Sequence, residues 1–550
     1  MTRRIALAGW GLALLLAWLV AYPLVLVLLT AVRDAGGWTL EHVRRFASES
    51  MEWSALWGSL WISFATVALA GAIGVPLAFL FGRHEFPGRR ALGALVALPA
   101  VLPPLVGVLA FLFLFGERGF LAHLVVAVAG LDEAPWRLQG AGAILLVHAY
   151  SMYVYFYLFT RAALARLDTA QLDAAASLGA GRWRTLWRVI LPALRPAIAG
   201  AALLTFMTSL GSFSAPYLFG GGFRVMTTQI VSTRLNGDES LAMVQTFTLT
   251  AAALVALALF RRLEGAGVAS SGAKGVAPAR TEVSRGWRRA AVALGAGLVA
   301  VVLLLPPLTL LLISFVPAGT WTVEPLPPEW SLGNWTALVR DPERLRPLLN
   351  SLWMALLATG ASVSLALAVG HYAVRRKVSA GRLLEGLVTM PWAVPGTVFA
   401  IALATAFGVN APWAARVVLI GTLWILPLAY LVRNLPITSR AILAGYRGLD
   451  PAQEEAAASL GASRWRILRR VTLPLLRPAI AAGAALAFAT ALGDFVTSVL
   501  LYTYRTRPIS MEILASLRQA DVGVAAAYGV TLMLVSAAAF RLGAERSGAG

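Results

Sequence analysis

"DAAASLGAGRWRTLWRVILP" (residues 173–192) returns 282 positions later in the chain as "EAAASLGASRWRILRRVTLP" (residues 455–474). Around these strings, residues 171–200 align with residues 453–482 without a gap and share 22 of 30 amino acids. A repeat at about half the length of the 550-residue chain predicts two copies of one structural unit, placed one after the other.

Three further blocks recur between the halves. They are "SLGSF" (209–213) with "ALGDF" (491–495), "SLW" at Ser59 with the same string at Ser351, and "PAVLPPLVG" (99–107) with "PWAVPGTVF" (391–399). The last two pairs lie 292 residues apart, so the first half carries about ten extra residues, which we place in the loop around 117–142. The repeat therefore covers nearly all of each half.

The composition indicates that lipid is the main solvent of this chain. Hydrophobic residues make up 59% and charged residues only 13%, whereas soluble domains carry roughly a quarter charged residues. The apolar stretches are long enough for helices that cross a bilayer, which need about 20 residues. The first stretch follows Arg3 and Arg4 and is too long for a signal peptide, so we interpret it as a retained helix. We expect an all-α integral membrane protein.

Each half is predicted to contribute six spanning helices, giving about 12 transmembrane helices in two parallel six-helix repeats. In the first half the spans are expected near 5–32, 58–81, 91–115, 142–160, 194–215 and 244–260. In the second half they are expected near 288–316, 350–374, 383–407, 412–433, 477–493 and 524–541. The chain then divides into a first unit (1–262), a flexible linker rich in Gly, Ala and Ser (263–287), and a second unit (288–550).

The net charge of +20 is distributed over alternate loops. The basic loops are 83–90, 261–289 and 375–382, and the neutral or acidic loops are 33–52, 117–137, 224–239 and 324–346. This alternation is the positive-inside pattern, which puts the basic loops, the linker and both termini in the cytoplasm. The excess of arginine thus indicates membrane topology, and we expect no nucleic-acid partner.

The repeated loop has the residue order of a short helix followed by a corner. Asp168 is a candidate N-cap, and Gly179 suits the left-handed residue that ends a helix. Trp183 and Trp187 then stand among arginines, as expected at the headgroup level, and Pro192 is predicted to break the chain before a span begins near Leu194. The second copy follows the same plan with Asp450, Gly461, Trp465 and Pro474.

A single loop of this kind favours a helix that lies on the membrane surface. Two copies at matching positions favour instead a pair of docking helices that fit paired clefts of a symmetric partner.

At this loop the chain resembles the permease subunits of bacterial ATP-binding-cassette importers, whose signature is E-A-A-x-x-x-G, nine residues, then I-x-L-P. The matching residues are Asp173, Ala174, Ala175 and Gly179 in the first half, and Glu455, Ala456, Ala457 and Gly461 in the second. Asp173 departs from the usual Glu, and Val189 and Val471 depart from the usual Ile. The resemblance implies a multi-pass protein of the bacterial inner membrane, with two coupling helices that dock on two copies of a cytoplasmic ATPase, and a periplasmic substrate-binding protein as a further partner.

The chain itself lacks a phosphate-binding loop. That motif needs a lysine followed by Ser or Thr, and the only lysines, Lys274 and Lys377, are followed by Gly and Val. We therefore expect a permease that is not an enzyme and holds no cofactor, with ATP and magnesium bound by the partner ATPase. The five histidines show no metal-ligand spacing, so no metal site is predicted.

The fused layout resembles the permeases of ferric iron and thiamine importers, with polyamine, sulfate and phosphonate importers as more distant relatives. The run "LYTYRTRPIS" (501–510) looks like the ferric-iron branch, so iron is the favoured cargo.

Polar residues after the repeated loops are candidates for the translocation pathway. They are Thr208, Ser209, Thr490 and Asp494. The alternative is that the hydroxyls bond their own helix backbone and that Asp494 sits at the outer water interface. The prolines of 99–104 and 391–395 are interpreted as kinks that shape a cavity.

Two other classes of protein remain as alternatives. An ion-coupled secondary transporter also uses repeated six-helix halves, but it would be expected to carry carboxylates or lysines in the middle of its spans. A membrane scaffold without transport activity would have no reason to present two matched docking loops.

Overall fold

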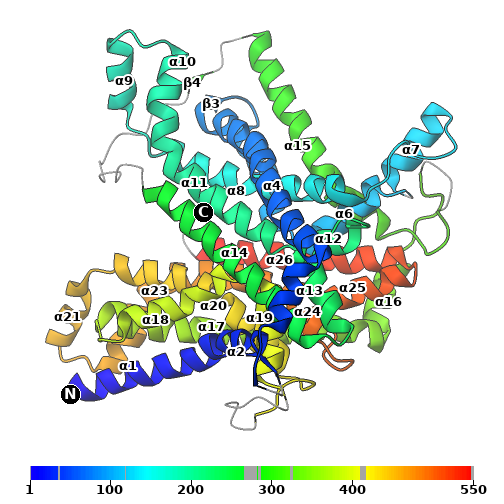
Figure 1. The fold of residues 1–550 in the computed structure, drawn as a ribbon. Coiled ribbons are helices and arrows are strands. Elements are labelled where there is room, and N and C mark those ends of the chain that lie inside the picture. Colours follow the sequence, from blue (N-terminus) through cyan, green and yellow to red (C-terminus); the bar gives the residue numbers. More distant parts are fainter. Residues whose placement is uncertain are drawn as a thin grey trace.

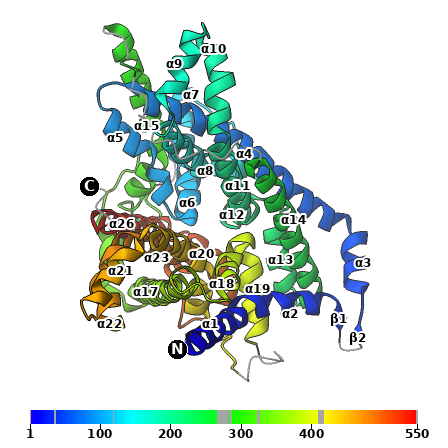
Figure 2. The same cartoon turned by 90° about the vertical axis from the view of Figure 1, so that its left-hand side faces the viewer.

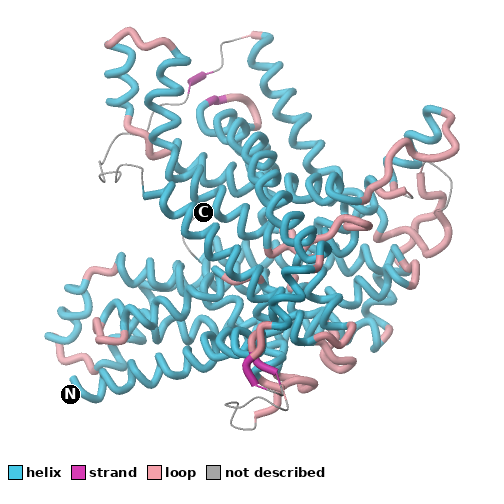
Figure 3. Tube along the Cα trace, viewed as in Figure 1, coloured by secondary structure: helices cyan, strands magenta, loops and turns pink. Residues whose placement is uncertain are grey.

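The computed structural model describes residues 2–34, 37–117, 119–265, 281–282, 286–321, 326–408 and 417–546, and most of its trace is helical, with loops between the helices (Figures 1 and 3). The strands in these ranges form two short pairs. β1 (Arg33–Asp34) pairs antiparallel with β2 (Gly37–Trp38), and β3 (His84–Glu85) pairs parallel with β4 (Thr281–Glu282). The predicted all-α class is confirmed.

The helices of the first half follow one another in this order, with η marking short π- or 3₁₀-helical segments: α1 (Thr2–Leu16), η1 (Ala17–Ala21), α2 (Tyr22–Ala31), α3 (Glu41–Ser48), α4 (Ser50–Arg83), α5 (Arg89–Val96), η2 (Leu98–Val101), α6 (Pro104–Phe115), α7 (Phe120–Ala129), α8 (Gly140–Leu164), α9 (Thr169–Ser177), α10 (Arg182–Thr185), η3 (Leu186–Ile190), α11 (Leu191–Leu210), α12 (Ser214–Phe219), α13 (Met226–Leu235) and α14 (Glu239–Gly265).

The second half repeats this order with few changes: α15 (Trp287–Ile313), α16 (Gly333–Arg340), α17 (Pro342–Val369), η4 (Gly370–Arg375), α18 (Gly381–Thr389), η5 (Met390–Ala393), α19 (Gly396–Ala406), α20 (Ile425–Gly448), α21 (Pro451–Ser459), α22 (Arg464–Ile467), η6 (Leu468–Thr472), α23 (Leu473–Leu492), α24 (Val496–Leu501), α25 (Ile509–Arg518) and α26 (Val522–Arg546).

Corresponding helices make corresponding contacts. In the first half α4, α8 and α11 pack against one another, and α14 covers α11. In the second half α17, α20 and α23 do the same, and α26 covers α23. The two bundles carry their repeated loops, α9–α10 and α21–α22, at separate edges of the molecule (Figures 1 and 2).

The first helix of each half packs against the other half. α2 packs on α19, and α15 packs on α6. The ring centroids of Trp18 and Phe407 lie 5.1 Å apart across one of these contacts. α15 is also held by α8, because the hydroxyl of Tyr150 donates a hydrogen bond to the carbonyl oxygen of Leu303 at 2.8 Å. This exchange buries a continuous apolar core shared by both halves.

Within the described residues, ten helices are long and apolar enough to cross a membrane. The pair formed by α18–η5 and α19 passes the same test only as a unit, with a bend of 114° between its parts, so the candidate spans number ten or eleven. The bend follows Pro391 and Pro395, and the first half has the matching break, with η2 between α5 and α6. A proline lacks the N–H that continues the helical hydrogen bonds, so these prolines interrupt the helices as predicted, while the cavity that they are expected to shape stays a prediction.

One predicted span is wrong. Residues 412–416 lie outside the described residues, residues 417–424 are not helical, and the helix runs instead over Ile425–Gly448 as α20. α20 carries Arg433, Arg440 and Arg447 at a seven-residue spacing, so these arginines share one face and its other face packs on α17 and α23. Hydropathy misses such a helix because its polar face lowers the average.

Most of the predicted linker, 266–280 and 283–285, lies outside the described residues. The described residues of this segment belong to its neighbouring elements or to a short strand. α14 ends at Gly265, Thr281–Glu282 forms β4, and α15 begins at Trp287.

Candidate coupling loops and the seam between the halves

The first helix of each repeated loop is capped as the sequence predicts. The carboxylate of Asp168 accepts a hydrogen bond from the N–H of Ala170 at 3.0 Å and so caps α9. Asp450 does the same for α21 through the N–H of Ala452 at 2.9 Å. Each cap satisfies an N–H that would otherwise lack a partner at the start of the helix.

Both helices end in a left-handed glycine. Gly179 has φ +70° and Gly461 has φ +77°. Around each glycine two backbone hydrogen bonds close the helix end, from Gly179 to Ala176 and from Ala180 to Ala175 in the first loop. The second loop has the same pair of bonds, which together form the Schellman motif. The predicted helix-and-corner geometry is confirmed in both copies.

Pro192 and Pro474 do not break the chain, contrary to expectation. The helix is continuous from Arg182 to Leu210 and from Arg464 to Leu492. A π-helical segment, η3 or η6, precedes each Leu-Pro pair, and the proline then occupies the first turn of α11 or α23. A proline is tolerated there because the widened turn before it absorbs the lost hydrogen bond. Each repeated loop thus runs into a spanning helix without a break in the helical backbone.

The outer faces of the loops combine apolar and acidic groups. Leu178 is 85% exposed and Leu460 is 89% exposed. The carboxylates of Asp173 and Glu455 are exposed and have no partner among the described residues. Ala174 and Ala456 are also exposed, whereas Ala175 is buried and Ala457 half-buried against the rest of the loop. The sequence does not identify these two leucines as site residues, although both lie inside the repeated block.

The inner faces of the loops differ. In the first loop Leu172 packs on an apolar cluster that includes Ile190 and Phe81. In the second loop Glu454 occupies the position of Leu172, and its carboxylate binds Arg375 and Thr472, each at 2.7 Å. Burial tends to raise the pKa of Glu454, but the hydrogen bonds from Thr472 and Arg375 outweigh it, so this pKa lies below its usual range.

The repeated "LG-x-F" strings meet where the halves touch. Gly211 lies against Pro395, with 3.7 Å between the position of an added Cβ and the proline. Gly493 lies against Pro103 so closely that an added Cβ would stand 2.5 Å from it. The rings of Phe213 and Phe495 are 5.6 Å apart between these contacts. We call this contact, made by residues 211–213 and 493–495 with Pro103 and Pro395, the seam.

In the first half the seam is lined by a neutral polar cluster. His148 contacts Ser212 through Nε2 at 2.9 Å and Ser209 through Nδ1 at 3.1 Å. Thr66 lies 3.3 Å from both Nδ1 of His148 and the hydroxyl of Ser209. The hydroxyl of Ser209 therefore bonds side chains of other helices, contrary to the alternative that the hydroxyls bond only their own helix backbone.

In the second half the seam carries charge. Asp494, which is 5% exposed, pairs with Arg433 at 2.5 Å. Its other carboxylate oxygen accepts hydrogen bonds from the hydroxyl and N–H of Thr497, the latter at 2.9 Å. Asp494 is thus buried, with both of its carboxylate oxygens hydrogen-bonded, and it does not lie at an open water interface.

The two remaining pathway candidates bond their own helices. The hydroxyl of Thr208 donates to the carbonyl of Leu204 at 2.7 Å, and that of Thr490 donates to Leu486 at 2.8 Å. The alternative interpretation is confirmed for these two threonines.

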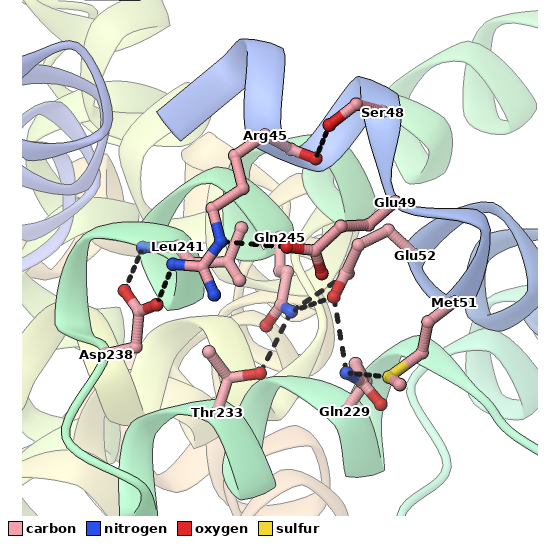
Figure 4. A network of polar contacts seen from close by, with 10 residues as sticks. All are labelled: Arg45, Ser48, Glu49, Met51, Glu52, Gln229, Thr233, Asp238, Leu241 and Gln245. Carbon is pink, nitrogen blue, oxygen red and sulfur yellow. Dashed lines mark hydrogen bonds and ion pairs between the residues drawn. The ribbon is translucent and has the colours of Figure 1, made fainter. Parts of the chain in front are cut away.

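At the far end of each bundle from its coupling loop, the repeated "SLW" serines hold a short helix. The hydroxyl of Ser59 accepts the N–H of Met226 at the start of α13, at 2.7 Å, and Ser351 accepts that of Ile509 at the start of α25, at 2.8 Å. In the first half a polar network strengthens this contact (Figure 4). Glu52, which is buried, accepts hydrogen bonds from Gln229 and Gln245 and so fixes α13 and α14 against α4.

The family model described as "Binding-protein-dependent transport system inner membrane component" matches the chain twice, over residues 74–265 and 358–544. A probable ABC transporter permease protein, y4fN, of Sinorhizobium fredii is 29% identical over 98% of this chain and 96% of its own length. The ferric transport system permease protein FbpB of Actinobacillus pleuropneumoniae is 26% identical, over 96% of this chain and 76% of its own length. The thiamine transport system permease protein ThiP of Escherichia coli is 29% identical, over 87% of this chain and 86% of its own length.

Each match of the family model contains one of the repeated loops, and together the matches cover more than half of the chain. The resemblance drawn from the loop signature is therefore confirmed, and the chain belongs to the inner-membrane permease components of binding-protein-dependent transport systems, with two such units fused in one polypeptide.

Proposed function

We propose that this importer permease is driven by two copies of a separate ATPase, one docked on α9 and one on α21. The observation that carries the proposal is the doubled loop surface, with an exposed leucine and an exposed carboxylate at the same places in both copies. An apolar knob beside a free carboxylate suits a cleft that is apolar inside and basic at its rim. ATP and magnesium belong to the ATPase, and the permease holds no cofactor.

This proposal fails if the permease hydrolyses ATP without a partner. The purified chain is expected to show no ATP turnover alone and turnover only after a cognate ATPase subunit is added. Robust hydrolysis by the isolated chain would contradict the assignment of the nucleotide to another subunit.

Both coupling loops and both termini are proposed to lie in the cytoplasm, because the basic loops alternate in register with the spans. Cysteine is absent from the natural chain, so single cysteines label cleanly. In intact cells, Ser331→Cys should react with an impermeant reagent and Ser270→Cys should not. The reverse pattern would overturn the topology.

Ferric iron, delivered by a periplasmic binding protein, is the proposed cargo. Support comes from the ferric permease among the relatives and from the "RPIS" run, which reaches the seam because the hydroxyl of Ser510 donates to the carbonyl oxygen of Asp494 at 2.8 Å. Cells that depend on this permease should take up radiolabelled iron, and excess thiamine should not compete. Thiamine uptake that is lost on deletion, with iron uptake unchanged, would assign the cargo to the thiamine branch.

A further inference from the structure

Glu454 forms a three-part clamp on the side of the second coupling helix that faces the spans. Nε of Arg375 donates to Oε2 of Glu454 at 2.7 Å, and the hydroxyl of Thr472 donates to Oε1 at 2.7 Å. Nη2 of Arg375 also donates to the carbonyl oxygen of Pro451, the first residue of α21, at 3.1 Å. Both carboxylate oxygens are used, and the pair is largely shielded, since Arg375 is 18% and Glu454 21% exposed.

The clamp joins the coupling helix to two different spans. Arg375 is the last residue of η4, which continues α17, and Thr472 is the last residue of η6, which opens α23. A single side chain of α21 is thereby bonded to the ends of both. Hydrogen bonds with fixed directions at both carboxylate oxygens restrict the rotation of α21 about its own axis.

The first half lacks this clamp at every matching position. The repeat places Leu172 at the position of Glu454, Ile190 at that of Thr472, and Arg83 at that of Arg375. Leu172 and Ile190 make apolar contacts, and Nη1 of Arg83 is buried without a hydrogen-bond partner among the described residues. Apolar contacts are non-directional, so they hold α9 near its spans without fixing its rotation.

We propose that Glu454 is a positioning residue that locks α21 to α17 and α23, so that the second coupling loop moves with its spans as one body. The first coupling loop can rotate, because apolar side chains hold it against its spans at the matching positions. The two loops then present the same outer surface but transmit motion unequally. The consequence for ATP use rests on the proposed function, whereas the clamp itself is a property of the permease alone.

Hydrogen exchange on the full-length permease in detergent tests the clamp. Glu454→Gln and Arg375→Gln should each speed amide exchange in residues 451–461 by about threefold, as expected for loss of a partly exposed ion pair. Arg83→Gln, the matched change in the first half, should leave exchange in residues 169–179 unaltered. The double exchange Glu454→Arg with Arg375→Glu should restore slow exchange. Unaltered exchange in both single variants would overturn the clamp.

Transport by the complete importer in proteoliposomes tests the consequence. Glu454→Gln should raise the number of ATP molecules hydrolysed per cargo imported by about threefold, with the ATPase still bound. Glu455→Gln is the control, because it changes the outward carboxylate and should weaken ATPase binding without altering exchange in the loop. An unchanged ratio in Glu454→Gln would overturn the unequal transmission. If the wild-type chain binds no ATPase, the proposed function fails and the exchange result still decides the clamp.

Discussion

The two proposed coupling loops are alike where they face outward and different where they face the membrane spans. Both have an aspartate cap, a left-handed glycine and a leucine that is at least 85% exposed. Inward, the first loop rests on Leu172 and the second on Glu454. The seam shows the same division, with neutral Ser212 in one half and Asp494 paired to Arg433 in the other. A fused permease can thus keep the same outer loop surface in two copies while the residues that support the loops differ between the halves.

Substitution at the corner glycines should have the largest effect. At φ +77°, Gly461→Val forces a β-branched residue into the left-handed region at a cost of about 2 kcal/mol, enough to reorient a nine-residue helix but not to unfold the bundle. Nothing lies within 4 Å of an added Cβ at Gly461 or Gly179, so the effect is one of the backbone. Cargo uptake should fall at least about tenfold for the valine variant at either position.

Asparagine at the same positions is the matched control, because Asn adopts the left-handed region readily. Gly461→Asn should retain most of the uptake. Equal loss in Gly461→Asn and Gly461→Val, or normal uptake in both, would show that the left-handed corner is not what matters.

The seam should respond unequally to the same small change in its two halves. An alanine at position 493 would place its Cβ 2.5 Å from Pro103, whereas one at position 211 would stand 3.7 Å from Pro395 and 3.3 Å from its nearest contact, the carbonyl oxygen of Met207. Gly493→Ala should therefore cost about 1–3 kcal/mol through overpacking, and Gly211→Ala much less. Thermal unfolding of the two variants in detergent measures this difference. Equal melting temperatures would show that the close approach at Gly493 is not maintained.

Removal of the outward carboxylates of Asp173 and Glu455 tests how strongly each loop binds the ATPase. Glu455 reaches one methylene farther than Asp173, and both are free of partners among the described residues. Glu455→Ala should weaken ATPase binding by about fivefold, and Asp173→Ala by about twofold, as expected for rim charges. Titration of labelled ATPase onto each variant gives the two ratios. A larger loss of ATPase binding from Asp173→Ala than from Glu455→Ala would show that the first loop, not the second, depends more on its carboxylate.

Acid should loosen the second loop and not the first. Because the pKa of Glu454 is lowered in the folded protein, its carboxylate stabilises the loop fully at neutral pH, and this contribution is lost as the pH falls below the usual carboxyl range of about 4. A spin label at Ser459→Cys should gain mobility between pH 7 and pH 3, and one at the matching Ser177→Cys should not. Glu454→Gln should abolish the pH dependence at Ser459→Cys, and persistence of that dependence would point to another group.

Much of this architecture can be predicted from the sequence, because the repeat fixes the positions of corresponding elements. Capping by Asp168 and Asp450 and the turns at Gly179 and Gly461 depend on local backbone chemistry, and both were predicted correctly. The helix α20 was placed too early because hydropathy averages over its polar face, although the repeat offset of 282 from α8 leads to the observed position.

Other features depend on contacts between distant segments. The pairing of Asp494 with Arg433 and the clustering of His148 with Thr66 join residues 61 and 82 positions apart, which no local pattern reveals. The exposure of Leu178 and Leu460 was missed for a different reason. An isolated leucine in a repeated block looks like a core residue, and only the fold shows that it points away from the core.

The central claim is that two matched outer surfaces each bind one ATPase, and the exposed leucines test it most directly. Native mass spectrometry of the complex should show two ATPase copies per permease for the wild type. It should show mainly one copy for Leu178→Ser or Leu460→Ser, and none for the double variant, with permease stability unchanged because both side chains are at least 85% exposed. Two ATPase copies retained by the double variant would contradict the claim.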